Sequence, residues 1–172
     1  MTETDLVPSE PQPSLDPSVF LEGELTPAKL ASFRAAAFKT VDSFQQLRDW
    51  LFDPRAQGTA RGITLWALGR HADAAPLLAA AEDNDAANLC LAESYAALGQ
   101  IDNVKAKLPN RESDPTQTLV WMRALDTSNS EELVEAVEKL NHLLGPADQA
   151  YFRGRVLELQ RDVDGSIAAY DE

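Results

Sequence analysis

The sequence predicts an all-α fold made of stacked antiparallel helix pairs. Ala and Leu dominate the apolar residues, while Ile and Val are sparse. That balance favours helix, because unbranched side chains lose little rotamer freedom there. Apolar residues recur at spacings of three and four, which is the period of a helix face. Gly69 and Gly99, 30 residues apart, follow such stretches where a helix end needs positive φ.

Charge and composition make several functions unlikely candidates for this chain. The 172 residues carry a net charge of -13, and an acidic surface repels phosphate groups, so we expect no nucleic-acid partner and no membrane partner. Cys90 is the single cysteine, which suits a reducing compartment. The N-terminus lacks the pattern of a secretory signal, and no apolar run is long enough to span a membrane. We therefore expect a cytoplasmic protein.

Residues 1–25 differ in composition from the rest of the chain. They contain four prolines and six acidic residues, with neither Lys nor Arg. Such a segment buries too little apolar surface to offset the entropy lost on ordering. We predict a disordered, acidic, proline-rich arm here.

Residues 26–54 predict an N-terminal helix or helix pair. Thr26-Pro27 has the pattern of a helix start, with a hydroxyl cap and a proline at the first helical position. The apolar stripe that follows forms either one long helix or two helices broken near Asp42-Ser43. A capping-box spacing that starts at Ser43 favours the break. The stripe consists of Leu30, Phe33, Ala37, Val41, Phe44, Leu47 and Leu51.

Residues 55–172 repeat a unit of helix, turn and helix. Gly69 and Gly99 mark the turns of the first two units, Asp114-Pro115 begins the third unit, and Ser130 is the expected cap of its second helix. The last unit stops inside a helix without a polar terminal cap, so we expect a longer protein. The predicted units span about residues 55–84, 85–114, 115–146 and 147–172.

These units resemble the tetratricopeptide repeat (TPR) family, in which small residues of one helix pack beside large residues of the next. Gly154 and Tyr170 fit that spacing in the last unit, and Gly62 and Leu78 fit it in the first. The period here is about 30–32 residues against the family's 34 or so, and the third unit lacks the turn glycine. The resemblance implies a right-handed α-solenoid whose first helices line a concave side that holds peptides or helices.

The resemblance also implies which residues would contact a partner. Arg123 and Arg155 are expected to hold a carboxylate or backbone carbonyl groups. The alternative is that the apolar members pack against neighbouring helices and the arginines are solvated. The expected peptide-binding residues are Thr59, Ile63, Trp66, Leu89, Glu93, Leu119, Arg123, Tyr151, Arg155 and Glu158.

We expect no enzymatic activity, no metal and no cofactor. The two histidines, His71 and His142, lie in different units and together with Cys90 lack the ligand spacing of a zinc site. No nucleophile and base can be paired, and no glycine-rich phosphate loop follows a strand.

The function favoured by the sequence is that of a non-catalytic interaction scaffold or adaptor, which binds a peptide or helix of another protein on its concave face. The alternative is the regulatory or oligomerisation half of a larger enzyme or sensor that continues beyond residue 172. Self-association through residues 26–52 or through the last helix is a third possibility.

Overall fold

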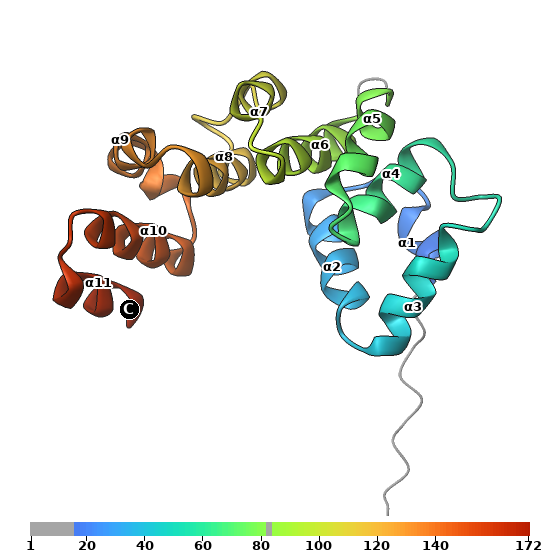
Figure 1. The fold of residues 1–172 in the computed structure, drawn as a ribbon, viewed down its shortest axis with the longest axis horizontal. Coiled ribbons are helices and arrows are strands. Elements are labelled where there is room, and N and C mark those ends of the chain that lie inside the picture. Colours follow the sequence, from blue (N-terminus) through green and yellow to red (C-terminus); the bar gives the residue numbers. More distant parts are fainter. Residues whose placement is uncertain (1–15, 82–83) are drawn as a thin grey trace, which may run out of the picture.

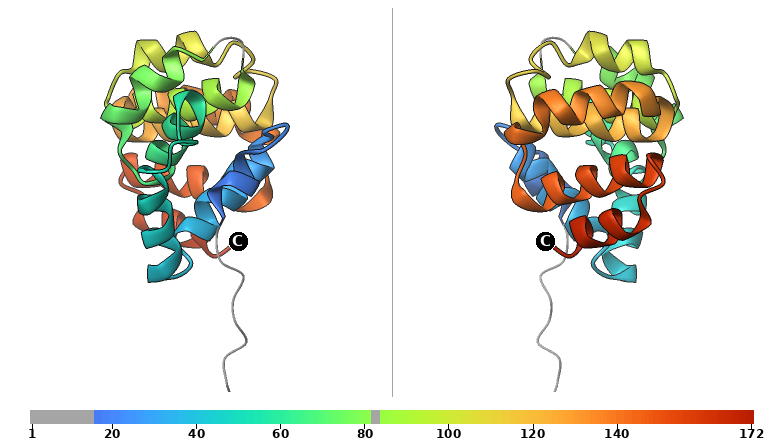
Figure 2. Two further views of the ribbon diagram at one scale, coloured as in Figure 1. Left: turned by 90° about the vertical axis from the view of Figure 1, so that its right-hand side faces the viewer. Right: turned by 90° about the vertical axis from the view of Figure 1, so that its left-hand side faces the viewer.

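The computed structural model describes residues 16–81 and 84–172, and every regular element in these ranges is a helix. Figure 1 shows the helices following one another along a curved array, and Figure 2 shows the same array from its two ends. The helices are α1 (Pro17–Leu21), α2 (Pro27–Ala37), α3 (Val41–Trp50), α4 (Gly58–Ala67), α5 (His71–Ala79), α6 (Asp85–Ala97), α7 (Ile101–Lys107), α8 (Pro115–Ser128), α9 (Ser130–Leu140), the 3-10 helix η1 (Asn141–Leu143), α10 (Pro146–Leu159) and α11 (Val163–Tyr170).

Four helix pairs, α4–α5, α6–α7, α8–α9 and α10–α11, occupy the residue ranges expected for the four repeats. Each helix packs on its partner, and the first helices of the first three pairs also pack on one another, α4 on α6 and α6 on α8. Most of the core contacts are therefore made between elements that are close in the chain, as in a repeat protein.

Three of the four turns have the same geometry. Gly69, Gly99 and Arg161 adopt positive φ, at 73°, 70° and 65°. The residue after each of them donates its N–H to a carbonyl group five residues earlier, which is the helix-ending Schellman bond. These bonds are Arg70 to Leu65 at 2.8 Å, Gln100 to Tyr95 at 2.9 Å and Asp162 to Leu157 at 2.9 Å. The repeat seen in the sequence therefore corresponds to the same turn conformation in three of the four helix pairs.

Two glycines on first helices make room for large side chains of the second helices. A Cβ atom added to Gly62 would lie 2.9 Å from Leu78 Cδ2. A Cβ atom added to Gly154 would lie 2.3 Å from the ring of Tyr170. Both contacts join the residue pairs on which the resemblance to the TPR spacing rests, and both need a residue without a side chain.

The described part of the N-terminal segment differs from the arm that its composition predicts. Residues 1–15 of that expectation lie outside the described residues. Residues 16–25 include helix α1, where Asp16 accepts the N–H of Ser18 at 2.9 Å. Leu21 and Leu25 pack against the core that α2 and α4 share. The structure therefore has a short helix and two packed leucines in a stretch whose composition predicts disorder.

Residues 26–54 form two helices, α2 and α3, with the break at residues 38–40. The break falls earlier than Asp42-Ser43, because the Thr40 hydroxyl group accepts the Ser43 N–H at 3.0 Å and caps α3. Ser43 is thus the capped residue and not the cap. Helix α2 packs on both α4 and α6, so it contacts the first helices of two successive pairs.

The buried apolar residues form two clusters that meet on α6. The first cluster joins α2 and α3 to α4, α5 and the first half of α6. The second cluster joins the end of α6 to α7, α8, α9 and α10. Leu89 and Tyr95 of α6 pack against both clusters, so α6 connects the two halves of the array.

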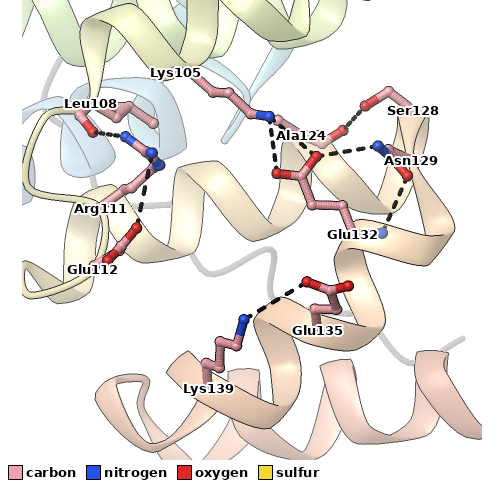
Figure 3. A network of polar contacts seen from close by, with 10 residues as sticks. All are labelled: Lys105, Leu108, Arg111, Glu112, Ala124, Ser128, Asn129, Glu132, Glu135 and Lys139. Atoms are coloured by element: carbon pink, nitrogen blue, oxygen red, sulfur yellow. Dashed lines mark hydrogen bonds and ion pairs between the residues drawn. The ribbon is translucent and has the colours of Figure 1, made fainter.

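Polar contacts reinforce the second half of the array on the side of α7 and α9 (Figure 3). Lys105 of α7 lies 3.0 Å from the Glu132 carboxylate of α9 and 5.1 Å from the centre of the Trp121 ring of α8. Asn129 donates to Glu132 at 3.2 Å and also caps α9. The Glu132 carboxylate thereby links α7 to α9 (Figure 3).

In the described ranges, the helices are too short or too polar for any of them to cross a lipid bilayer.

Candidate binding groove

A hollow of about 530 Å³ lies between α2 and α8, with α6 beneath it. We call it the α2–α8 groove. Its walls are largely apolar, through Leu89 and Leu119, which are half-buried, and the alanines of α2. Such a surface is suited to the apolar side chains of a bound segment. The lining residues are Pro27, Leu30, Ala31, Arg34, Ala35, Trp66, Leu89, Glu93, Thr116, Leu119, Val120 and Arg123.

Three polar groups meet in this groove. Glu93 accepts one hydrogen bond from Arg34 Nη1 and one from the Trp66 indole N–H, each at 2.9 Å. The Arg34 guanidinium group lies 5.1 Å from the centre of the Trp66 ring, within the range of a cation–π contact. The three residues come from α2, α4 and α6, so this cluster holds α2 against the array.

A second hollow of about 270 Å³ adjoins the groove and shares Arg34, Glu93, Val120 and Arg123 with it. Arg123 is the more available of the two arginines, since its side chain is 62% exposed and lies 3.4 Å from Asp148. The Arg34 side chain is 44% exposed and already paired with Glu93. A guanidinium group at the rim of an apolar groove is placed to receive a carboxylate.

His71 and Cys90 lie near the groove, and their pKa values are shifted. Burial lowers the pKa of His71, and the nearby Arg34 lowers it further. The His71 Nδ1 atom lies 3.4 Å from the Ser94 hydroxyl group. Burial also raises the pKa of Cys90 well above its ordinary value, which leaves the thiol protonated and unreactive at neutral pH.

Five of the ten residues expected to contact a partner come together in the groove, namely Trp66, Leu89, Glu93, Leu119 and Arg123. Two of the remaining five residues, Thr59 and Ile63, belong to α4 and do not line the groove. Ile63 is fully buried in the core, so it packs between helices and is closed to a partner. Thr59 lies in the first turn of α4, half-buried.

Tyr151, Arg155 and Glu158 form a separate cluster around Asp126. Asp126 accepts from the Tyr151 hydroxyl group at 2.8 Å and from Arg155 Nε at 2.9 Å, and Arg155 also pairs with Glu158. Hydrogen bonds to Asp126 and Glu158 raise the pKa of Arg155. Burial, followed by the bond to Asp126, raises the pKa of Tyr151. Arg155 thus lies outside the groove, and its guanidinium group pairs with residues of its own chain.

Arg34 and the rest of α2 are absent from the set expected from the sequence. The sequence of α2 does contain a feature that could have indicated a role for Arg34. This residue lies four residues after Leu30 and one after Phe33, at the edge of the apolar stripe. A charged residue at that edge is close to whichever element covers the stripe. The sequence does not reveal that α2 packs on α4 and α6.

Few of the residues that line the groove are titratable. Its titratable groups are Arg34, Glu93, Arg123 and the neighbouring His71, and Glu93 is committed to two donors. Over residues 16–81 and 84–172, no three His, Cys, Asp or Glu side chains are placed to hold a metal ion.

The geometry thus defines an all-helical protein with a groove between helices that are distant in the chain. Comparison with protein-family models, with curated proteins and with solved structures finds no match to this chain.

Replacing Glu93 by alanine is expected to lower the free energy of unfolding by about 1–2 kcal/mol, because the indole N–H of Trp66 and the Arg34 guanidinium group lose their acceptor. Glu93→Gln keeps an acceptor oxygen and should lose less. Urea denaturation measures both. The control is Glu135→Ala, which removes an ion pair with side chains 72% exposed and should change stability by less than about 0.5 kcal/mol. Equal effects of Glu93→Ala and the control would contradict the role given to Glu93.

Stability is expected to fall as the pH drops through the range just below the ordinary histidine pKa of 6.5, because the pKa of His71 is lowered in the folded chain. In that range the unfolded chain binds more protons than the folded chain, and protonation therefore favours unfolding. The loss ends once the pH is below the pKa of the folded state. Thermal melts between pH 5 and 8 (about the range in which histidine titrates) should show a smaller slope for His71→Gln than for His142→Gln. Identical slopes would refute the assignment to His71.

Proposed function

We propose that this chain is a non-catalytic scaffold that binds a short segment of another protein in the α2–α8 groove. The observation that carries the proposal is the meeting of apolar walls with an exposed arginine in one hollow, formed by helices distant in the sequence. Glu93 already accepts hydrogen bonds from Arg34 and Trp66. The features of the groove that remain for a ligand are therefore its apolar surface and Arg123. These two features favour a ligand that is apolar and carries a carboxylate.

The proposal includes a TPR-like right-handed solenoid as the framework. Two findings support it: the repeated turns at Gly69, Gly99 and Arg161, and the glycine contacts of Gly62 and Gly154. In such a framework the first helices of successive pairs face the same side. The groove belongs to that side, because Trp66, Glu93 and Arg123 come from α4, α6 and α8, the first helices of three pairs. A cytoplasmic location accords with the single, unreactive cysteine.

The bound segment is proposed to lie along α6 between α2 and α8. Leu89 and Leu119 would contact its apolar side chains, and Arg123 would pair with its carboxylate at the rim. Asp148 lies 3.4 Å from Arg123 in the free protein, so a ligand carboxylate would displace a weak, exposed contact. An exposed ion pair contributes little to stability, and this exchange is therefore easy.

Selection from a displayed library of random peptides on the full chain tests the proposal. Ala31 lines the groove and is exposed, so Ala31→Trp fills the groove with little effect on the core. The matched control is Ala106→Trp, on the exposed surface of α7. We expect enriched peptides to combine apolar residues with Asp or Glu, to bind the control as they bind the wild type, and to lose at least tenfold in affinity for Ala31→Trp (about 1.4 kcal/mol).

Charge reversal at Arg123 separates the two parts of the ligand. Arg123→Glu should weaken the peptides that carry a carboxylate and leave peptides without one unchanged. Peptides that bind Ala31→Trp as tightly as the wild type, or a selection that enriches nothing over an unrelated helical protein, would overturn the proposal.

A further inference from the structure

The second hollow, of about 270 Å³, continues the α2–α8 groove to His71, the first residue of α5. We call it the His71 hollow. Its polar lining residues are Arg34, His71, Glu93, Arg123 and Thr127, and its other lining residues are three alanines and one valine. These short side chains leave space between the polar groups for part of a ligand.

A chain of hydrogen bonds fixes the tautomer of the His71 ring. The buried Ser94 hydroxyl group donates its hydrogen to the Cys90 carbonyl group at 2.8 Å. The Ser94 oxygen, 3.4 Å from His71 Nδ1, is therefore an acceptor, and we assign the hydrogen of the neutral ring to Nδ1. The other ring nitrogen, Nε2, has no hydrogen-bond partner in the described part of the chain. Protonation of His71 turns Nε2 into a donor.

The charged residues nearest to His71 along the chain have partners of their own. Arg70 pairs with Asp73 at 2.6 Å. On α4, which also packs against α5, the charged residue is Arg61, and it donates to the Leu51 carbonyl group. The charges that face His71 across the hollow therefore come from α2, α6 and α8.

Of these facing charges, Arg123 has the weakest pairing. Arg34 of α2 and Glu93 of α6 pair with each other at 2.9 Å, whereas Arg123 of α8 lies 3.4 Å from Asp148 and is 62% exposed. Burial and the nearby Arg34 lower the pKa of His71 in the free protein. A carboxylate close to His71 has the opposite effect, because an anion stabilises the protonated ring.

We propose that the His71 hollow receives the carboxylate of the bound segment between Arg123 and His71, and that His71 takes up a proton as the segment binds. The inference rests on the proposed function and adds a second binding residue to it. The carboxylate is either the C-terminus of the partner or an Asp or Glu side chain. Once protonated, His71 donates from Nε2 to this carboxylate, while Nδ1 stays bonded to Ser94.

The proton taken up makes binding depend on pH. The complex holds more protons than the free chain over the range in which His71 titrates, so affinity rises as the pH falls through that range. Proton and ligand each favour the binding of the other. The free protein, in contrast, is destabilised by the same proton, since the His71 pKa is lowered in the folded chain.

The affinity of a peptide for the full chain, measured against pH, tests the inference. The probe is the tightest peptide from the display selection that carries a carboxylate and lacks histidine. Its carboxylate stays ionised throughout, because Asp and Glu have pKa values of about 4. From about pH 7.5 to about pH 5.5, the range in which histidine titrates, the wild type should bind about threefold more tightly or better.

Two matched variants assign the effect, because the chain contains only two histidines. His71→Gln keeps a polar side chain that does not titrate, and its affinity should be the same at both pH values. His142→Gln, in the 3-10 helix η1, should keep the pH dependence of the wild type. Unchanged circular dichroism confirms the fold of each variant. Calorimetry in two buffers of different ionisation enthalpy should show proton uptake for the wild type and none for His71→Gln.

Modified peptides identify the carboxylate that enters the hollow. If the terminal carboxylate is the ligand, amidation of the C-terminus should abolish the proton uptake. If a side chain is the ligand, replacement of the peptide's Asp or Glu by Asn or Gln should abolish it. Proton uptake that survives the loss of every carboxylate would contradict the inference.

NMR of the histidine rings measures the proton on His71 directly. The peptide should raise the pKa of His71, and the His142 signal is the internal control. A His71 pKa that stays the same or falls on binding, or a pH dependence that persists in His71→Gln, would overturn this inference and leave the α2–α8 groove as a binding site. A selection that enriches no peptide would overturn the proposed function and this inference with it.

Discussion

Replacing Phe33 by alanine is expected to lower the free energy of unfolding by about 3–5 kcal/mol, the usual effect of removing a buried aromatic ring. Phe33 is 1% exposed and belongs to the cluster that joins α2 to α4 and α6. Its removal leaves a cavity where α2 lies across the array. Because α2 is one wall of the α2–α8 groove, the same substitution should also weaken peptide binding.

Urea denaturation followed by circular dichroism measures this loss. The matched control is Phe52→Ala, which removes the same ring from a site that is 84% exposed and should change stability by less than about 0.5 kcal/mol. If Phe33→Ala is no more destabilising than the control, α2 does not pack on the array as described.

Replacing Gly62 by valine is expected to lower stability by about 2 kcal/mol, through overpacking between α4 and α5. The added Cβ would lie 2.9 Å from Leu78, and Leu78 is 1% exposed and enclosed by the core, so it has little room to move. The gain in helix propensity over glycine, about 0.5 kcal/mol, offsets only part of this loss.

Differential scanning calorimetry of Gly62→Val beside Ala106→Val separates packing from propensity. Ala106 is exposed on α7, so valine there should lower stability only by its propensity, less than about 0.7 kcal/mol. A melting temperature for Gly62→Val at or above that of the wild type would show that the helices of the first pair are not in close contact at this residue.

Much of the helical framework could be predicted because its determinants are local. Thr26 and Asp114 cap α2 and α8 with the prolines at the first position, as their sequence pattern indicates. Gly69 and Gly99 adopt the positive φ expected at turns. A capping hydrogen bond or a positive φ depends on a few neighbouring residues, which a pattern contains in full.

One-residue errors arose where two adjacent residues suit the same role. Asn129, rather than Ser130, caps α9, since its side chain accepts the N–H of Glu132 at 3.2 Å. Asn and Ser are both good caps, and the phase of the preceding helix α8 decides between them. The local sequence pattern fits both residues and does not contain the packing of α8 on α6.

The candidate groove could be predicted only in part, for a related reason. The resemblance to the TPR family implied that Trp66, Glu93 and Arg123 lie on one side of the array, and the structure brings them together. The contribution of Arg34 depends on α2 crossing α4 and α6, a contact between segments distant in the chain. The pairing of Arg155 with Asp126, 29 residues away on another helix, is likewise not contained in a local pattern.

The central claim is that the α2–α8 groove is the binding site, and methyl NMR tests it most directly. The leucine and valine methyl groups of the full chain would be labelled and titrated with the tightest peptide from the display selection. The account predicts the largest shift changes at Leu89, Leu119 and Val120, with contacts from the peptide to both α2 and α8. Largest changes at Val41, Val156 or Val163, with Leu89 and Leu119 unmoved, would contradict it.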